Sequence, residues 1–215
     1  MNTLAHLVVI LLLLTNFLLL ATGSMKLLIR LMVAQGVLLA LLLPLMPTSP
    51  DFTHTLFFCL AVLGIKGLCL PWLLKRTLRR VIREAHLAPP VGYTFSLLAS
   101  IPILLFSLWL ETRLPLAPGV FPFLLFPAAC GALFAGFVLI AGRRKALSQV
   151  VGYLAIENGI FLLGLPLISE AGGLCFEALI LLDVLAVVFV MGIAIRHISD
   201  AFDSIDVGRL CALKD

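Results

Sequence analysis

Three ionisable side chains interrupt the most apolar stretches of this chain: Lys66, Glu157 and Asp183. Each lies near the middle of a segment long enough to cross a lipid bilayer. A charge at the bilayer centre costs about 2.5–3.5 kcal/mol on insertion scales, so such residues usually line an ion route or pair inside a helix bundle. We therefore predict that these three residues take part in proton or ion translocation.

Glu157 follows two other polar residues at helical spacing. Gln149, Tyr153 and Glu157 are four residues apart, so they share one face of a helix. This stripe leads from one end of its segment toward the middle of the bilayer, as an entry path to a buried carboxylate would. The alternative is a carboxylic acid that only joins helices by hydrogen bonds. A neutral amide would serve that purpose equally well, which favours a proton relay.

Asp183 and Lys66 lie at depths similar to that of Glu157. Asp183 is 13 residues before Arg196, which corresponds to about 20 Å of helix. Its carboxylate is a candidate relay partner for Glu157. Lys66 has the opposite charge, and two interpretations stay open. It either carries protons or tunes the carboxylates, or it forms a plain ion pair with Asp183 or Glu157.

The composition indicates an integral membrane protein. Of the 215 residues, 62% are hydrophobic and 12% are charged, with a mean hydropathy of +1.21. A soluble domain is closer to about 25% charged. The sequence is basic, but its basic residues lie between the apolar segments. They therefore predict membrane topology and argue against a nucleic-acid partner.

The expected fold is an all-α transmembrane bundle, because backbone polar groups within lipid must be paired inside the protein. We count about seven transmembrane helices. Residues 1–20 carry no Lys or Arg before their apolar run, so we interpret that run as a retained helix and not as a signal peptide. The expected spans are roughly 4–22, 27–46, 53–74, 91–110, 119–141, 147–168 and 173–195.

The segments between these spans alternate in charge. One side of the membrane has Arg113 as its one basic residue, and the positive-inside rule places that side outside the cytoplasm. We therefore expect a multi-pass protein of a bacterial or archaeal cytoplasmic membrane, with its N-terminus outside and its C-terminus cytoplasmic. The basic residues of the other side are Lys26, Arg30, Lys75, Arg76, Arg79, Arg80, Arg83, Arg143, Arg144, Lys145, Arg196, Arg209 and Lys214.

A faint internal repeat relates the two halves. An ungapped overlay of the second span on the sixth places Gln35 opposite Glu157, and an overlay of the third on the seventh places Lys66 opposite Asp183. A chance match of leucine-rich segments is the alternative. The repeat predicts two three-helix units in parallel orientation, joined by one helix. The expected divisions are an N-terminal unit (1–76), a basic cytoplasmic connector with a linker helix (77–115), and a C-terminal unit with a short cytoplasmic tail (116–215).

Two segments resemble a known family. VVGYLAIENGIFLL and LLDVLAVVFVMGIAIRHI resemble the second and third helices of the small K subunit of respiratory complex I. Over its whole length the chain is similar to the hydrogenase-4 component E family, in which extra N-terminal helices precede a K-subunit-like unit. The resemblance is most specific over residues 147–215.

This resemblance implies a function. The family supplies membrane-arm subunits to group 4 nickel–iron hydrogenase and formate hydrogenlyase-type complexes, beside antiporter-like subunits, in a polar axis for proton or sodium movement. The chain would be a non-catalytic subunit without a redox cofactor, and the nickel–iron centre and iron–sulfur clusters would lie in partner subunits. Glu157 and Asp183 match the two membrane carboxylates of the K subunit, and Lys66 matches a component E lysine. Gln35 departs from the carboxylate that the repeat would favour, so it joins Tyr153 and Gln149 as a supporting polar residue.

Two other functions stay open from the sequence. The chain could be a subunit of a multi-subunit cation/proton antiporter, whose small subunit the C-terminal unit also resembles. It could also be a structural membrane scaffold with buried ion pairs. A Glu157→Gln variant that assembles normally but loses redox-coupled pumping would exclude the scaffold.

Overall fold

The computed structural model describes residues 3–46, 56, 59–70, 72, 92–113, 122–143, 146–171 and 192. These ranges contain helices and no strand. The predicted all-helical class is therefore confirmed for the part of the chain that is described. The helices are α1 (Thr3–Ala21), α2 (Met25–Leu42), η1 (Leu43–Leu45), η2 (Leu63–Cys69), α5 (Tyr93–Glu111), α6 (Leu125–Ala141) and α7 (Ala146–Ala171).

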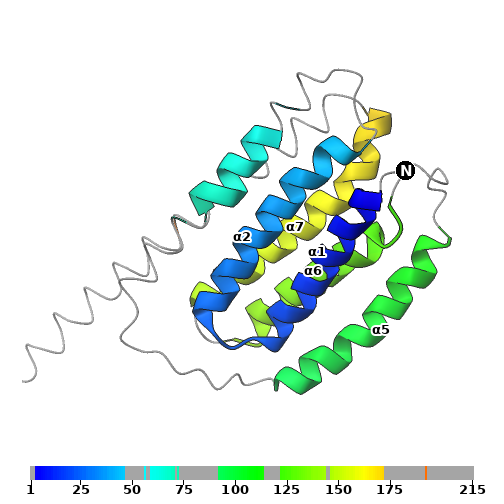
Figure 1. Ribbon diagram of the computed structural model, residues 1–215. Coiled ribbons are helices and arrows are strands. Elements are labelled where there is room, and N and C mark those ends of the chain that lie inside the picture. The colour runs from blue at the N-terminus through cyan, green and yellow to red at the C-terminus, as the bar shows by residue number, and fades with distance from the viewer. Residues whose placement is uncertain are drawn as a thin grey trace, which may run out of the picture.

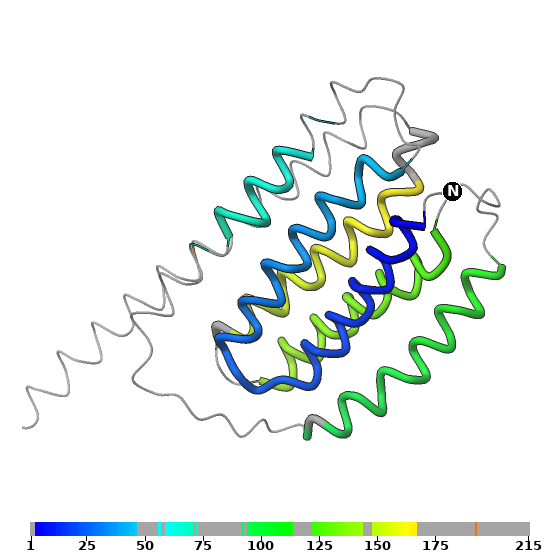
Figure 2. Tube along the Cα trace, viewed as in Figure 1, coloured from blue at the N-terminus to red at the C-terminus, as the bar shows by residue number. Residues whose placement is uncertain are grey.

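The helices form an elongated bundle in which successive segments run in opposite directions (Figures 1 and 2). Helices α1, α2, α6 and α7 make its centre. The η2 segment packs on α2 at one flank, and α5 packs on α6 and α1 at the other flank. Helix α1 packs on α2 and α6 packs on α7, and α1 also packs on α6 and α2 on α7, so polar residues from distant parts of the sequence can meet inside the bundle.

Six of the seven predicted spans coincide with described helices. Four of them are long and apolar enough to cross a membrane: Thr3–Ala21, Met25–Leu45, Thr94–Glu111 and Ser148–Pro166. Two others, Cys59–Cys69 and Leu125–Ala141, are shorter apolar helices. The predicted seventh span, 173–195, lies outside the described residues, so the count of seven and the repeat stay predictions.

The fifth predicted span begins later than expected. The sequence predicts a span over 119–141, whereas the described helix begins at Leu125. Leu124 adopts a left-handed backbone conformation with φ 73°, which an α-helix cannot include. Its N–H donates a hydrogen bond of 3.1 Å to Oε1 of Glu111 at the end of α5. This bond fixes the turn that enters α6.

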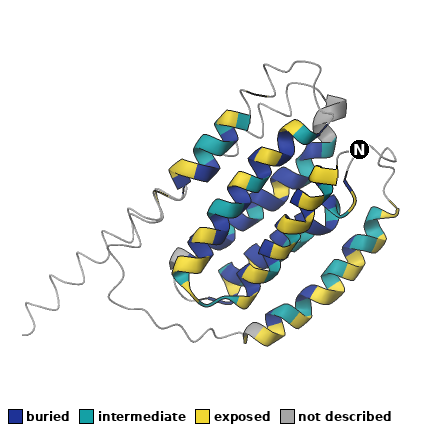
Figure 3. Ribbon diagram, in the orientation of Figure 1, coloured by how far each residue is buried: buried dark blue, intermediate teal, exposed yellow. Residues whose placement is uncertain are grey.

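Helices α6 and α7 approach closely because glycines face each other across their contact. A Cβ added to Gly136 would lie 2.5 Å from the carbonyl oxygen of Gly152, and one added to Gly152 would lie 2.7 Å from that of Gly136. Small residues allow such close approach in membrane bundles. Buried residues gather on the faces that the central helices turn toward one another, whereas α5 exposes much of its apolar surface (Figure 3).

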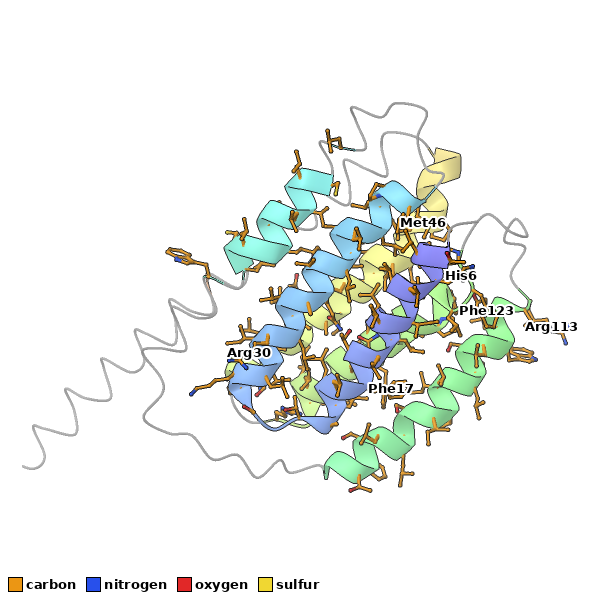
Figure 4. All side chains as sticks on the ribbon, in the orientation of Figure 1. His6, Phe17, Arg30, Met46, Arg113 and Phe123 are labelled. Atoms are coloured by element: carbon orange, nitrogen blue, oxygen red, sulfur yellow. The ribbon has the colours of Figure 1, made fainter. Side chains whose placement is uncertain are left out.

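Two basic residues mark the opposite ends of the bundle. Arg30 projects near the beginning of α2, and Arg113 projects just beyond α5 at the other end (Figure 4). Both side chains are exposed. Their separation agrees with the alternation of charge found in the sequence. Which end faces the cytoplasm stays a prediction.

Candidate functional site

Lys66 lies in a π-helical turn that packs against α2. The backbone N–H of Leu70 donates to the carbonyl of Ile65, five residues earlier, at the end of this turn. A Cβ added to Gly36 would lie 2.8 Å from the carbonyl oxygen of Lys66 and 2.9 Å from its Cβ. Gly36 therefore lets the backbone of Lys66 come directly against α2. Turns of this kind are rare in helices and are frequent at functional sites.

The ammonium of Lys66 forms an ion pair with the carboxylate of Glu157. The Nζ atom is 2.6 Å from Oε1, and each side chain is 3% exposed. Nζ also lies 4.9 Å from the centroid of the Phe161 ring, within the range of a cation–π interaction. Removing two charges from water costs several kcal/mol per ion, so a buried pair persists only with good geometry and additional polar partners. The next contacts of Lys66 supply such partners.

An amide on α7 joins the ion pair to α2. The ammonium of Lys66 donates to Oδ1 of Asn158 at 2.9 Å. The Nδ2 group of Asn158 in turn donates to Oε1 of Gln35 at 3.1 Å. Neighbouring residues of one helix, Glu157 and Asn158, thus both contact the same ammonium, one by charge and one by a carbonyl dipole.

The polar chain then crosses from α2 to α1 and α6. The Nε2 group of Gln35 donates to Oδ1 of Asn16 at 2.8 Å and to Oγ1 of Thr15 at 3.1 Å. The Nδ2 group of Asn16 donates to the backbone carbonyl of Ala128 on α6 at 2.9 Å. We call the hydrogen-bonded series Lys66, Asn158, Gln35, Asn16 and the Ala128 carbonyl the donor chain. It connects all four central helices to η2.

The predicted site residues fall into three groups. Lys66, Glu157 and Gln35 come together in the buried cluster, and of the two carboxylates that the sequence offers as partners of Lys66, the structure pairs it with Glu157. Tyr153 is partly buried and Gln149 is exposed, so burial increases along this stripe toward Glu157. Asp183 lies outside the described residues, and its predicted place beside the pair stays a prediction.

Sequence reasoning missed Asn158, Asn16 and Thr15. Their signal was available, because each is a polar residue within an apolar span. Thr15 was easy to overlook, since a hydroxyl can be satisfied within its own helix. Its Oγ1 does donate to the carbonyl of Leu12 at 2.7 Å. Asn158 directly follows Glu157, whose charge is the stronger signal in the sequence.

A second buried cation lies at the far end of α6. Arg143 follows α6 and is buried. Its Nη2 donates to the carbonyl oxygen of Thr22 at 2.5 Å and to that of Leu19 at 3.4 Å. Cations favour helix C-termini because the last carbonyls there are without helical partners. Arg143 therefore caps α1, which gives this residue a structural role beyond its predicted contribution to topology.

The chemistry that this cluster allows is proton exchange at a buried charged pair. A carboxylate excluded from water can change its charge by one proton, and a fixed cation beside it biases that change. Within the described residues, no group of three or more His, Cys, Asp or Glu side chains gathers that could hold a metal ion.

Comparisons with known proteins place the chain in a family. It is 32% identical over 202 residues to the uncharacterized protein Rv0085 of Mycobacterium tuberculosis, which covers 89% of this chain and 87% of that protein. It is 33% identical over 120 residues to hydrogenase-4 component E of Escherichia coli (strain K12), and the same holds for component E of Shigella flexneri. That match covers 55% of this chain and 54% of component E. No family model and no solved structure matches the chain significantly.

The described residues define a class of protein: a bundle of helices long and apolar enough to cross a membrane, with a buried ammonium–carboxylate pair. The chain belongs to the family of the mycobacterial protein Rv0085. Its predicted resemblance to hydrogenase-4 component E is confirmed over 120 residues, about half the length of that relative. The similarity of residues 147–215 to the K subunit of complex I stays a prediction.

Proposed function

We propose that this chain is a membrane subunit of a redox-driven, hydrogenase-type complex and that Lys66 and Glu157 contribute to proton translocation through it. The observation that carries the proposal is the ion pair of 2.6 Å buried in the bundle. A pair that only joined helices would need no titratable group. A pair that loads and releases protons needs a titratable group, and neighbouring residues must hold that group in place.

The similarity to hydrogenase-4 component E supports the first half of this proposal. That relative is named as a hydrogenase component, and the match extends over 120 residues. In such a complex the electron-transfer centres, a nickel–iron site and iron–sulfur clusters, would lie in partner subunits. Antiporter-like membrane subunits would lie beside this chain in the bilayer.

The arrangement of polar residues supports the second half. Charged residues within membrane helices usually face a bundle interior and mark ion or proton routes. The stripe of Gln149, Tyr153 and Glu157 passes from exposed to buried and supplies a candidate approach to the carboxylate. We further propose that Asp183 continues the route beyond Glu157, as the resemblance to the K subunit implies.

The direct experiment is a Glu157→Gln variant in the complete complex. Inverted membrane vesicles would be given the electron donor, and proton uptake would be measured beside the rate of electron transfer. We expect normal copurification of the subunits and at least a tenfold loss of protons moved per electron. Unchanged proton uptake in a normally assembled complex would exclude Glu157 from the route.

A matched pair of lysine variants controls for charge. Lys66→Met removes the buried ammonium, whereas Lys26→Met makes the same substitution at an exposed position near the beginning of α2. We expect the first variant to lose proton uptake and the second to retain it. Sodium–proton exchange that proceeds without the electron donor would instead support the antiporter-subunit alternative.

Orientation is tested separately. We propose that the α1 N-terminus lies outside and the C-terminal residues lie in the cytoplasm. Reporter fusions after residue 113 and after residue 143 place these two positions on opposite sides of the membrane if the proposal holds. The same location for both reporters would contradict the alternating topology.

A further inference from the structure

The donor chain has one hydrogen-bonding direction, and its two ends fix that direction. An ammonium can only donate, so Asn158 must turn its Oδ1 atom toward Lys66. A backbone carbonyl can only accept, so Asn16 must turn its Nδ2 group toward Ala128. Gln35 lies between them and accepts from Asn158 while donating to Asn16. Reversing any one amide would bring two donors or two acceptors together.

This direction aligns the three amide dipoles with respect to Lys66. Each amide has its carbonyl oxygen on the side of the ammonium and its NH₂ group on the far side. Hydrogen-bonded series of this kind polarise one another at the low dielectric of a protein interior. Their common effect is to favour positive charge at Lys66. The face of the Phe161 ring, 4.9 Å from Nζ, acts in the same sense.

These contacts do not depend on Glu157. When the Glu157 carboxylate takes up a proton, Lys66 keeps the Asn158 oxygen and the Phe161 ring as partners. The ammonium is therefore not left as a stranded buried charge. Transfer of a proton from Lys66 to Glu157 would neutralise the ammonium and forfeit the stabilisation that the aligned amides and the ring provide.

Among the described residues, few other charges lie on the elements that surround Glu157. Lys66 faces it from η2, and Tyr153 lies one turn earlier on α7, near enough to interact electrostatically with it. Helix α2 contributes the neutral Gln35, and α6 contains no Asp, Glu, Lys, Arg or His. Glu157 is also the member of the pair that lies on the stripe leading toward the exposed Gln149.

From this geometry we infer that Lys66 stays protonated throughout the transport cycle and that Glu157 is the member of the pair that gains and loses a proton. Asn158, Gln35 and Asn16 are positioning residues that hold Lys66 in its charged form. This inference deepens the proposed function and rests on it. In each cycle Glu157 –COO⁻ takes one proton to become –COOH and later releases the same proton. The Lys66–Glu157 pair therefore alternates between net charge zero and +1, with no covalent or redox step.

The test measures both groups in the full chain, reconstituted in lipid bilayers with its lysines isotopically labelled at Nζ. Solid-state NMR distinguishes ammonium from amine, and the infrared stretch of the protonated carboxyl reports Glu157. Signals are assigned by their loss in Lys66→Met and Glu157→Gln. We expect Lys66 to remain an ammonium over the whole pH interval in which the Glu157 signal changes. A change of Lys66 to the amine in that interval, or no change at Glu157, would overturn the inference.

Variants of the donor chain test the positioning role. Asn158→Leu removes the oxygen that faces Nζ, and we expect Lys66 to bind its proton about tenfold more weakly, a shift of about one pH unit in the Nζ titration. Asn158→Asp keeps an acceptor oxygen there and should leave Lys66 at least as firmly protonated as in the parent. Gln35→Leu breaks the chain one link farther away and should shift the titration less, in the same direction. A titration unchanged by both leucine variants would refute the positioning role.

The outcome of these measurements is independent of whether the proposed function holds. They need no partner subunits and no proton pumping, so a loss of pumping in Glu157→Gln does not decide them. Conversely, an amine at Lys66 would leave a translocation route intact and move the relay from Glu157 to the lysine.

Discussion

Replacing Lys66 by Met tests how much of the bundle's stability depends on the pairing of its buried charges. Methionine keeps an unbranched side chain of similar length, so the main change is that Glu157 loses its cation. A glutamic acid with an ordinary pKa of about 4.3 would have to be protonated at pH 7 to become neutral, which costs about 3.7 kcal/mol. Removing one partner from buried ion pairs costs about 3–5 kcal/mol in other proteins. Both arguments predict that Lys66→Met lowers the free energy of unfolding by about 3–4 kcal/mol.

The assay is equilibrium unfolding of the full chain in lipid–detergent bicelles, in a double-mutant cycle with Glu157→Gln. The double variant carries neither charge, so we expect it to recover most of the loss, to within about 1–2 kcal/mol of the parent. The exposed control Lys26→Met should change the unfolding free energy by no more than about 0.5 kcal/mol. A Lys66→Met variant within about 1 kcal/mol of the parent, or a double variant as unstable as the sum of the single ones, would refute the reasoning.

Three further predictions follow from close contacts. Gly136→Ala places a methyl group 2.5 Å from a backbone oxygen of α7, so we expect the free energy of unfolding to fall by about 1–3 kcal/mol. Gly64→Ala is the control: its methyl group meets nothing within 4 Å, so this variant should not be destabilised. Gly36→Ala separates α2 from η2, and we expect the Lys66 NMR signal to shift even where the helix content measured by circular dichroism is unchanged. Arg143→Met removes the cap of α1 and should cost about 1.5–3 kcal/mol by thermal unfolding, compared with less than about 1 kcal/mol for Arg113→Met at an exposed position; equal losses for the two arginines would contradict the capping role.

The sequence predicted the parts of the fold that depend on hydropathy. Long apolar segments predicted where helices lie, and six of the predicted spans overlap described helices. The late beginning of α6 could not be predicted, because it depends on a left-handed residue, Leu124, held by the carboxylate of a preceding helix. Periodicity carries no information about such a contact between separate segments.

The candidate site was also predicted only in part, because the sequence shows its charged residues but not the contacts between separate segments. Charges in apolar spans are visible one residue at a time, so Lys66 and Glu157 stood out from the sequence. The partner of Lys66 depends on how η2 packs on α2, and that packing depends on Gly36 and on the local winding of the helix. The donor chain joins residues up to 123 positions apart. Asn and Gln residues occur frequently in sequences, so their presence alone did not predict the donor chain. The feature that defines it is the shared direction of its hydrogen bonds, which only the structure shows.

The π-helical turn at Leu63–Cys69 has a consequence for how this family can diverge. Such a turn winds more residues into each revolution than an α-helix does, so loss of a single residue there could restore ordinary winding. Residues beyond such a deletion would keep their faces, because the wide turn already holds the extra residue within one revolution. A deletion within an ordinary α-helix would instead rotate every later residue by about 100°. A one-residue gap in an alignment of relatives should therefore be tolerated at this turn, where it changes the placement of Lys66 itself and leaves the packing of the flanking residues in register.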